Sequence, residues 1–276
     1  MNIIPMIIDR SSVTMSHELM LAIEHGQLRK IKLLHQKDET LMSSKHELAH
    51  DQGKPVFDTV LNYAIGIGSK KTVIFLIEEF KLDIREIGAF GRNCIFSAFV
   101  GRKFEIAKYL HSLDKTLIRA KDVDGNPGLC FASGSSSKEI VQWLIEEVKC
   151  DILETGFKGG NCILAAIAYD EIETVNYLHS VDGNLIKAKD ENGIDALMLA
   201  IVNASVEMIQ LLIEKCDLDV HKADTRGWNC FHVAAHADKM KILAYLDSIE
   251  PVSGIRQVRI DLNLTRVSTS NFTRNR

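Results

Sequence analysis

Three stretches of this sequence are nearly the same: "GRNCIFSAFVGRKFEIAKYLHS" at residues 91–112, "GGNCILAAIAYDEIETVNYLHS" at 159–180 and "GWNCFHVAAHADKMKILAYLDS" at 227–248. Each begins 68 residues after the one before it. Gly125 and Gly193 divide these intervals in half, so the repeating unit is 34 residues long and alternate units resemble each other most. Similarity at a fixed period of this length indicates a stacked repeat architecture.

The unit that starts at Gly91 has two apolar faces with helical spacing. Ile95, Ala98 and Phe99 form the first face, and 106–110 form the second after the connection "VGRK". This spacing predicts two short helices. Neither is long enough to be stable alone in water, so each pair must bury its apolar face on its neighbours.

An asparagine stands where the first helix of three units begins. Asn93, Asn161 and Asn229 each precede a cysteine. An Asn side chain at this position can accept a hydrogen bond from an otherwise unpaired backbone N–H. We therefore predict that these residues are N-caps.

Composition and charge narrow the class of protein. The chain has 276 residues, of which 46% are apolar and 25% charged, as expected for a folded protein. It shows neither a signal-peptide pattern nor a run of apolar residues that could span a membrane. Its six scattered cysteines favour a reducing compartment, so we expect a cytoplasmic, intracellular protein.

The net charge of −4 is unevenly distributed. Residues 251–276 carry five arginines and one aspartate, a charge of +4, which leaves −8 on residues 1–250. Nucleic-acid binding requires clustered Lys and Arg for phosphate contacts. We therefore expect no nucleic-acid partner for the repeat body.

At this level of detail the sequence resembles the ankyrin repeats, whose unit is a β-turn followed by two antiparallel helices. The segment "ADTRGWNCFHVAAHADKMKILAYL" keeps the family's Asp224, Gly227, His232 and Ala234, but Asn229 and Cys230 replace its Thr-Pro pair. The resemblance covers residues 15–250. It implies an all-α solenoid of about seven stacked helix-turn-helix units with β-turn or hairpin loops.

The resemblance also divides the chain. A segment of 1–14 precedes the array, and 251–276 form a basic, poorly ordered tail that either covers the last unit or marks a fragment of a longer protein. Because the first interval is eight residues longer than the rest, we expect an extended loop at 35–56. The predicted units lie near 15–56, 57–90, 91–124, 125–158, 159–192, 193–226 and 227–250.

No pattern in the sequence indicates catalysis, a cofactor or a metal. Cysteines 68 residues apart, such as Cys94 and Cys162, would lie about 16–20 Å apart in a stack of repeats, too far for a shared zinc ion or a disulfide. We interpret them as small, partly buried residues. His232 falls on the family's structural histidine, and we expect His111 and His179 to be partly protonated near helix C-termini.

The resemblance implies partner binding through the turn tips and the concave face of the first helices. The residues of this chain at those places are Phe90, Arg92, Asn126, Phe157, Lys158, Tyr169, Ile194, Arg226, Trp228 and His236. Trp228 and Arg226 are the strongest candidates, because buried Trp and Arg dominate binding energies at interfaces.

We therefore expect a monomeric, non-enzymatic scaffold or adaptor that binds partner proteins. Two alternatives stay open: an inhibitory subunit or effector for one dedicated partner, and a targeting arm from a larger ankyrin-containing enzyme or channel.

Overall fold

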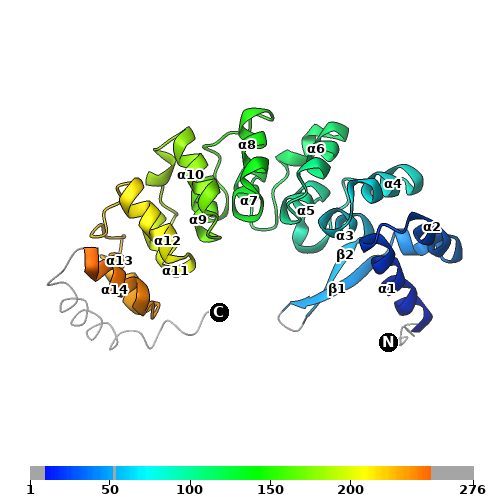
Figure 1. Ribbon diagram of the computed structural model, residues 1–276, viewed down its shortest axis with the longest axis horizontal. Coiled ribbons are helices and arrows are strands. Elements are labelled where there is room, and N and C mark those ends of the chain that lie inside the picture. Colours follow the sequence, from blue (N-terminus) through cyan, green and yellow to red (C-terminus); the bar gives the residue numbers. More distant parts are fainter. Residues whose placement is uncertain (1–9, 52–53, 250–276) are drawn as a thin grey trace, which may run out of the picture. The chain divides into compact units, whose positions relative to one another are not determined.

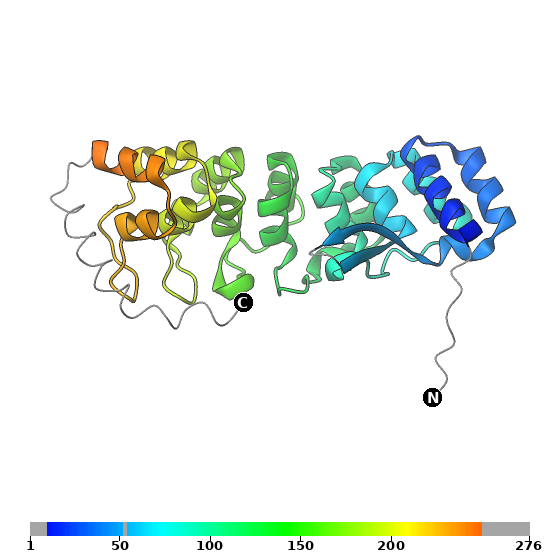
Figure 2. The same cartoon turned by 90° about the horizontal axis from the view of Figure 1, so that it is seen from below.

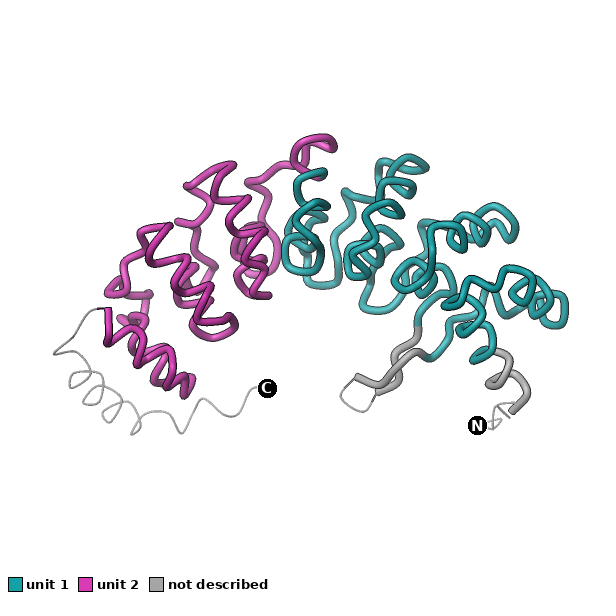
Figure 3. The backbone as a smooth tube through the Cα atoms, in the orientation of Figure 1, with its two compact units in different colours: residues 1–143 teal, residues 144–276 magenta. Residues whose placement is uncertain are grey.

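The protein is seen here in a computed structural model that describes the backbone of residues 10–51 and 54–249 and the side chains of 16–47 and 58–249. Within these residues, fourteen α-helices follow one another in pairs, with one two-stranded hairpin near the N-terminus (Figure 1). The predicted fold class, helical with repeated helix-turn-helix packing, is confirmed. Contacts divide the chain into two compact units, residues 1–143 and 144–276, and the boundary falls within α8 (Figure 3).

The N-terminal unit holds the first three helix pairs, α7 and most of α8. Helix α1 begins five residues before the predicted start of the array at residue 15. The first helices of the pairs are α1 (Arg10–Glu24), α3 (Val60–Ile67), α5 (Cys94–Val100) and α7 (Gly128–Ser135). The second helices are α2 (Leu28–Lys37), α4 (Lys70–Phe80), α6 (Phe104–Leu113) and α8 (Lys138–Glu146), and short 3-10 turns are η1 (Glu39–Met42), η2 (Ala89–Gly91) and η3 (Lys115–Arg119).

The core of this unit forms where first helices stack on first helices: α1 on α3, α3 on α5, and α5 on α7. Phe96 and Phe99 of α5 are completely buried, and the ring of Phe96 stacks on Phe131 of α7 with centroids 4.7 Å apart. On the layer of second helices, Trp143 of α8 packs edge-on against Phe104 and His111 of α6. The apolar face predicted from spacing is therefore the one that is buried.

The C-terminal unit repeats this arrangement, with α9 packed on α11 and α11 on α13 (Figure 2). Its first helices are α9 (Cys162–Ala168), α11 (Ala196–Asn203) and α13 (Cys230–His236). Its second helices are α10 (Ile172–Val181), α12 (Val206–Gln210) and α14 (Met240–Ile249). The remaining turns are η4 (Phe157–Gly159), η5 (Leu185–Lys187) and η6 (Leu211–Lys215), of which η6 continues α12 as a π-helical turn.

The prediction of an extended loop at 35–56 is wrong. Helix α2 runs to Lys37, and after η1 the chain forms an antiparallel hairpin of β1 (Lys45–Asp51) and β2 (Lys54–Thr59), with an irregularity in register between Glu47 and Ala49. A lone two-stranded hairpin is marginally stable in water, so it needs an anchor. His46 provides one: it is buried, and its ring nitrogens contact the Ser16 hydroxyl at 3.0 Å and the Leu41 carbonyl at 2.7 Å.

The predicted N-caps are confirmed. The side-chain oxygens of Asn93, Asn161 and Asn229 accept hydrogen bonds from the backbone N–H three residues later, and Thr59 and Asp195 do the same for α3 and α11. Helix α7 is the exception, because Pro127 stands at its cap position and offers no side-chain acceptor.

Two of these asparagines also make a second bond, over a longer distance along the chain. The Nδ2 group of Asn93 donates to the carbonyl of Leu117 at 2.7 Å, and that of Asn161 donates to Leu185 at 3.0 Å. Both carbonyls lie in the 3-10 turns η3 and η5 that lead to the following unit. One buried amide thus fixes the start of a helix and the exit of its unit. The carbonyl at the same interval after Asn229 belongs to residue 253, outside the described residues.

We predict that the two bonds of Asn161 contribute separately to stability. Asn161→Ser keeps an acceptor for the cap and loses the donor to Leu185, so the free energy of unfolding should fall by about 1 kcal/mol. Asn161→Ala loses both bonds, so the free energy of unfolding should fall by about 2 kcal/mol. Denaturant unfolding followed by circular dichroism measures both. The exposed Asn176→Ala is the control with little expected change, and equal losses for Ser and Ala would contradict separate roles.

Helix α7 should be the least stable first helix. It lacks a side-chain cap, contains Gly134, and its serines bond back to carbonyls four residues earlier: Ser133 to Leu129 at 2.8 Å and Ser136 to Ala132 at 2.7 Å. Glycine and back-bonding serine both weaken a helix. We predict that amides of residues 129–137 exchange with solvent faster than those of 163–170 in a hydrogen-exchange experiment. Equal protection of the two segments would contradict this.

Candidate functional site

The turns between units are held by buried or partly buried aspartates. Asp122, Asp190 and Asp224 each accept hydrogen bonds through Oδ1 from the backbone N–H groups two and four residues later, at 2.8–3.0 Å. A glycine with positive φ follows each aspartate by three residues, for example Gly227 at φ 81°. These bonds fix the backbone of the turn and therefore the direction in which its tip residues point.

The last of these turns carries an ordered group of side chains, here called the C-terminal turn cluster: Arg226, Trp228, His232 and His236. The guanidinium of Arg226 lies over the Trp228 ring, 5.0 Å from its centroid. On α13, His236 meets that ring edge-on at 5.0 Å, and His232 stacks at 6.4 Å. Trp228 is half-buried by these contacts, whereas His236 is exposed and the side chain of Arg226 is 52% exposed.

The carboxylate of Asp224 orients the guanidinium of Arg226. Its Oδ2 accepts bonds from Nε of Arg226 at 2.9 Å and from Nη2 at 2.8 Å. Burial raises the pKa of this carboxyl, but the hydrogen bonds from the Trp228 backbone and from Arg226 outweigh burial and lower its pKa below the ordinary value. The carboxylate is therefore ionised at neutral pH, and the charge-assisted bonds hold Arg226 against the indole.

His232 completes the start of α13. Its Nδ1 lies 2.6 Å from Oδ1 of Asn229 and 3.4 Å from the Asn229 N–H, so the two residues form a capping box. The expected structural role of this histidine is confirmed within its own turn. The contact between His232 and Trp228 was not predicted from the sequence, although the two residues are only four positions apart.

Phe90 and Arg92 form a second aromatic and cationic tip, in the N-terminal unit. Phe90 has φ 54° and is 47% exposed. The guanidinium of Arg92 lies over the Phe90 ring at 5.0 Å and over the ring of Phe131 at 5.4 Å. Phe131 could not be predicted from the sequence as a partner of Arg92, because the contact joins two adjacent repeats.

Phe157 and Lys158 form a third tip, in the C-terminal unit. Phe157 is 52% exposed, and Nζ of Lys158 lies 4.9 Å from the centroid of its ring. Lys158 has φ 52°, and its carbonyl accepts a bond from Glu191 N–H at 2.9 Å, which ties this tip to the next turn. The alternate repeats thus present a cation on an aromatic ring at their tips.

The other predicted residues do not join a cluster of this kind. Asn126 is half-buried, and its Nδ2 bonds to the Asp122 carboxylate at 3.0 Å, so it supports a turn. Ile194 is half-buried, and its N–H donates to Asp190 at 2.8 Å. Tyr169, at the end of α9, is 71% exposed. Only Arg226, Trp228 and His236 of the ten predicted residues meet in one group of three.

The repeated cysteines Cys94, Cys162 and Cys230 are buried. Burial raises the pKa of the Cys94 and Cys162 thiols to about 12, so both stay protonated at neutral pH. Burial against Trp143, followed by the nearby Lys115 charge, lowers the pKa of the His111 imidazole, which opposes the expected partial protonation. Among the residues that the structure describes, no three His, Cys, Asp or Glu side chains group as metal ligands.

The repeats seen in the structure have a counterpart among known families. Residues 162–253 match the family model described as ankyrin repeats in three copies. This segment belongs to the ankyrin-repeat family. Ankyrin repeats are protein–protein interaction modules and are generally non-catalytic. The family predicted from the sequence is confirmed, and the count of seven units stays a prediction.

Two further comparisons bear on the fold. No curated protein matches the sequence. A chain from the solved complex of the Bd0816 predatory endopeptidase from Bdellovibrio bacteriovorus with immunity protein Bd3460 is similar over 67% of this chain and 96% of its own length. The TM-score is 0.53 and the sequence identity 22%, so the similarity concerns the fold. Within the described ranges, no helix combines the length and the apolar composition needed to cross a bilayer.

The lowered pKa of Asp224 gives a prediction about acid sensitivity. A carboxyl with a depressed folded-state pKa stabilises the fold above its unfolded pKa, and this contribution is lost as the pH falls through the folded value. Arg226→Ala removes two bonds to the ionised form, so the pKa of Asp224 should rise toward 3.8. Carbon-detected NMR titration of the Asp224 carboxyl measures the change. The exposed Arg119→Ala should leave the midpoint unchanged, and an unchanged midpoint in Arg226→Ala would contradict the coupling.

Proposed function

We propose that this protein is a non-enzymatic scaffold or adaptor that binds partner proteins through its ankyrin turn tips and the groove along its first helices. The observation that carries the proposal is the C-terminal turn cluster. Trp and Arg are the residues that most often dominate binding energy at protein interfaces. Here both stand on a turn whose backbone is fixed by Asp224.

The cluster is organised before any partner arrives. Arg226 and Trp228 already contact each other, and Asp224 holds the guanidinium from the other side. Ordering a long side chain on binding costs about 0.5–1.5 kcal/mol, and here much of that cost is met by folding. The exposed half of Arg226 and the exposed His236 remain open to a partner, so the turn fits a role as an anchor.

The first-helix face of the C-terminal unit supports the groove part of the proposal. Tyr169 follows α9 and is 71% exposed, while Val202 near the end of α11 is 45% exposed. His236 ends α13, one repeat of 34 residues after Val202. Because α9 packs on α11 and α11 on α13, the C-terminal ends of these helices are neighbours in chain order, and His236 at the last of them belongs to the C-terminal turn cluster.

The chemistry of the thiols favours binding over catalysis. A cysteine nucleophile needs a thiolate, and the pKa values of about 12 for Cys94 and Cys162 keep both thiols protonated. We further propose that the protein acts as a monomer in the cytoplasm without a nucleic-acid partner. The charge of −8 on residues 1–250 supports the last point, because it opposes phosphate binding over the body as a whole.

Affinity capture tests the proposal. The whole chain is immobilised and exposed to lysate of the cells that produce it, beside the variant Arg226→Ala/Trp228→Ala. A matched variant, Lys115→Ala/Arg119→Ala, removes two exposed side chains of η3 that are not among the predicted contact residues. Circular dichroism must first show equal helicity for all three proteins.

We expect the matched variant to capture as much partner as the parent chain. The Arg226→Ala/Trp228→Ala variant should capture at least tenfold less, the loss typical of two anchor residues. One stoichiometric partner would favour the alternative of an inhibitory subunit, and several partners would favour the scaffold. Identical capture by all three proteins would reject the C-terminal turn cluster as the binding site.

A further inference from the structure

In the first three helix pairs, basic residues gather at the connection between the two helices and at the start of the second helix. Residues 26–30 cover the turn from α1 to α2 and the start of α2, residues 68–71 cover the turn from α3 to α4 and the start of α4, and residues 101–103 join α5 to α6. These three segments contain no acidic residue in a chain whose net charge is −4. Their cations, here called the basic edge, are Arg29, Lys30, Lys70, Lys71, Arg102 and Lys103.

The three connections are neighbours in space. Nζ of Lys103 donates to the carbonyl of Ile67 at 3.3 Å, which joins the second and third connections. Gly101 and Gly66 approach so closely that a Cβ on Gly101 would lie 2.4 Å from the Gly66 carbonyl oxygen. A Cβ on Gly26 would lie 3.6 Å from the Thr72 hydroxyl, so the first connection reaches the start of α4. The three segments therefore lie next to one another along one edge of the unit.

Part of this charge is not neutralised within the protein. Lys30 pairs with Glu18 at 3.6 Å, and Lys70 pairs with Glu105 at 3.3 Å. Arg29 and Lys71 are exposed, and neither has an ion pair or side-chain hydrogen bond with another described residue. The edge also contains the N-termini of α2, α4 and α6, each at least ten residues long, whose helix dipoles add to the positive potential.

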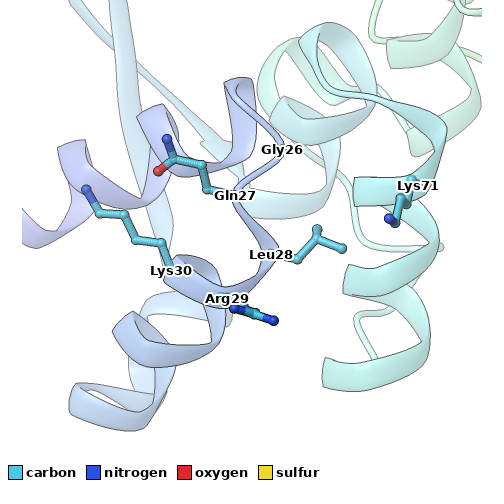
Figure 4. Close-up of a pocket in the computed structure, with 6 residues that line it drawn as sticks. All are labelled: Gly26, Gln27, Leu28, Arg29, Lys30 and Lys71. Atoms are coloured by element: carbon cyan, nitrogen blue, oxygen red, sulfur yellow. The ribbon is translucent and has the colours of Figure 1, made fainter.

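A hollow of about 580 Å³ lies at this edge, lined by Gly26, Gln27, Leu28, Arg29, Lys30 and Lys71 (Figure 4). Lys71 comes from α4 and faces Leu28 at the start of α2, whereas Lys30 points to the other side of α2 (Figure 4). A single small anion would need cations that converge on one point. These cations are distributed along the edge, so their arrangement fits several negative charges on one extended chain.

We propose that the basic edge binds an acidic segment of a partner protein, with Arg29 and Lys71 as its principal contacts. The half-buried Leu28 gives such a segment an apolar contact between the two cations. This surface is separate from the C-terminal turn cluster, and its test uses other residues, so either site can fail without the other.

The test measures binding of a fluorescein-labelled (Glu-Gly)5 peptide to the whole chain by fluorescence anisotropy at low ionic strength. The variant Arg29→Gln/Lys71→Gln is compared with Lys115→Gln/Arg119→Gln, which removes one lysine and one arginine from exposed positions of η3 in the same unit. Both variants have the same net charge, so a difference between them reports position. Circular dichroism confirms equal folding.

We expect the Arg29→Gln/Lys71→Gln variant to bind about fivefold more weakly than the parent, and the η3 variant to change by less than about twofold. Binding should weaken as salt is added, and a labelled (Gln-Gly)5 peptide should not bind. Hydrogen exchange should show new protection at residues 26–30 and 70–72 on addition of the acidic peptide.

Three results would overturn the proposal. Equal weakening by both variants would mean that net charge alone attracts the peptide. Absence of peptide binding to the parent chain at low ionic strength would mean that the basic edge is not such a site. Binding of phosphatidylserine vesicles without binding of the acidic peptide would assign the edge to a membrane surface instead.

Discussion

Two of the repeats depend on a side-chain amide at the start of their first helix. Asn93 and Asn161 use their oxygen to cap α5 and α9, and they use their nitrogen to hold the carbonyl of Leu117 or Leu185 at the exit of the same unit. Helices of seven to ten residues are unstable in isolation, so their order depends on the contacts with neighbouring units. A buried amide that joins both ends of a unit fixes the spacing at which those contacts form.

This framework also fixes the positions of the turn tips. Alternate turns begin with different residues. Gly88 and Gly156 begin the turns before Asn93 and Asn161, whereas aspartates begin the turns before α7 and α11. The turn before α13 combines the two patterns, since it has Asp224 as well as the asparagine cap. Asp224 places a buried carboxylate beside Arg226, and Asn229 bonds His232, so both sides of the C-terminal turn cluster are held at this turn.

Local features were predictable from the sequence, and contacts between distant segments were not. Helix faces and asparagine caps follow from spacing within ten residues. The hairpin at 45–59 depends on His46 reaching Ser16 and the Leu41 carbonyl, which no local pattern reveals. Likewise, the position of Arg226 at a turn tip could be inferred from the family resemblance. The packing of Arg92 on Phe131 could not, because these residues belong to different repeats.

The proposed contact residues can change without endangering the stack, because the two sets of positions have different partners. Buried apolar side chains meet other helices, as Phe96 of α5 stacks on Phe131 of α7, so their replacement would leave cavities in the core. Arg226 bonds to Asp224 and lies over the ring of Trp228, both within its own turn. Loss of this arginine therefore removes a surface group while the helix contacts remain. An array built in this way can keep one fold while the chemistry at its turn tips varies, which is the property that a recognition module requires.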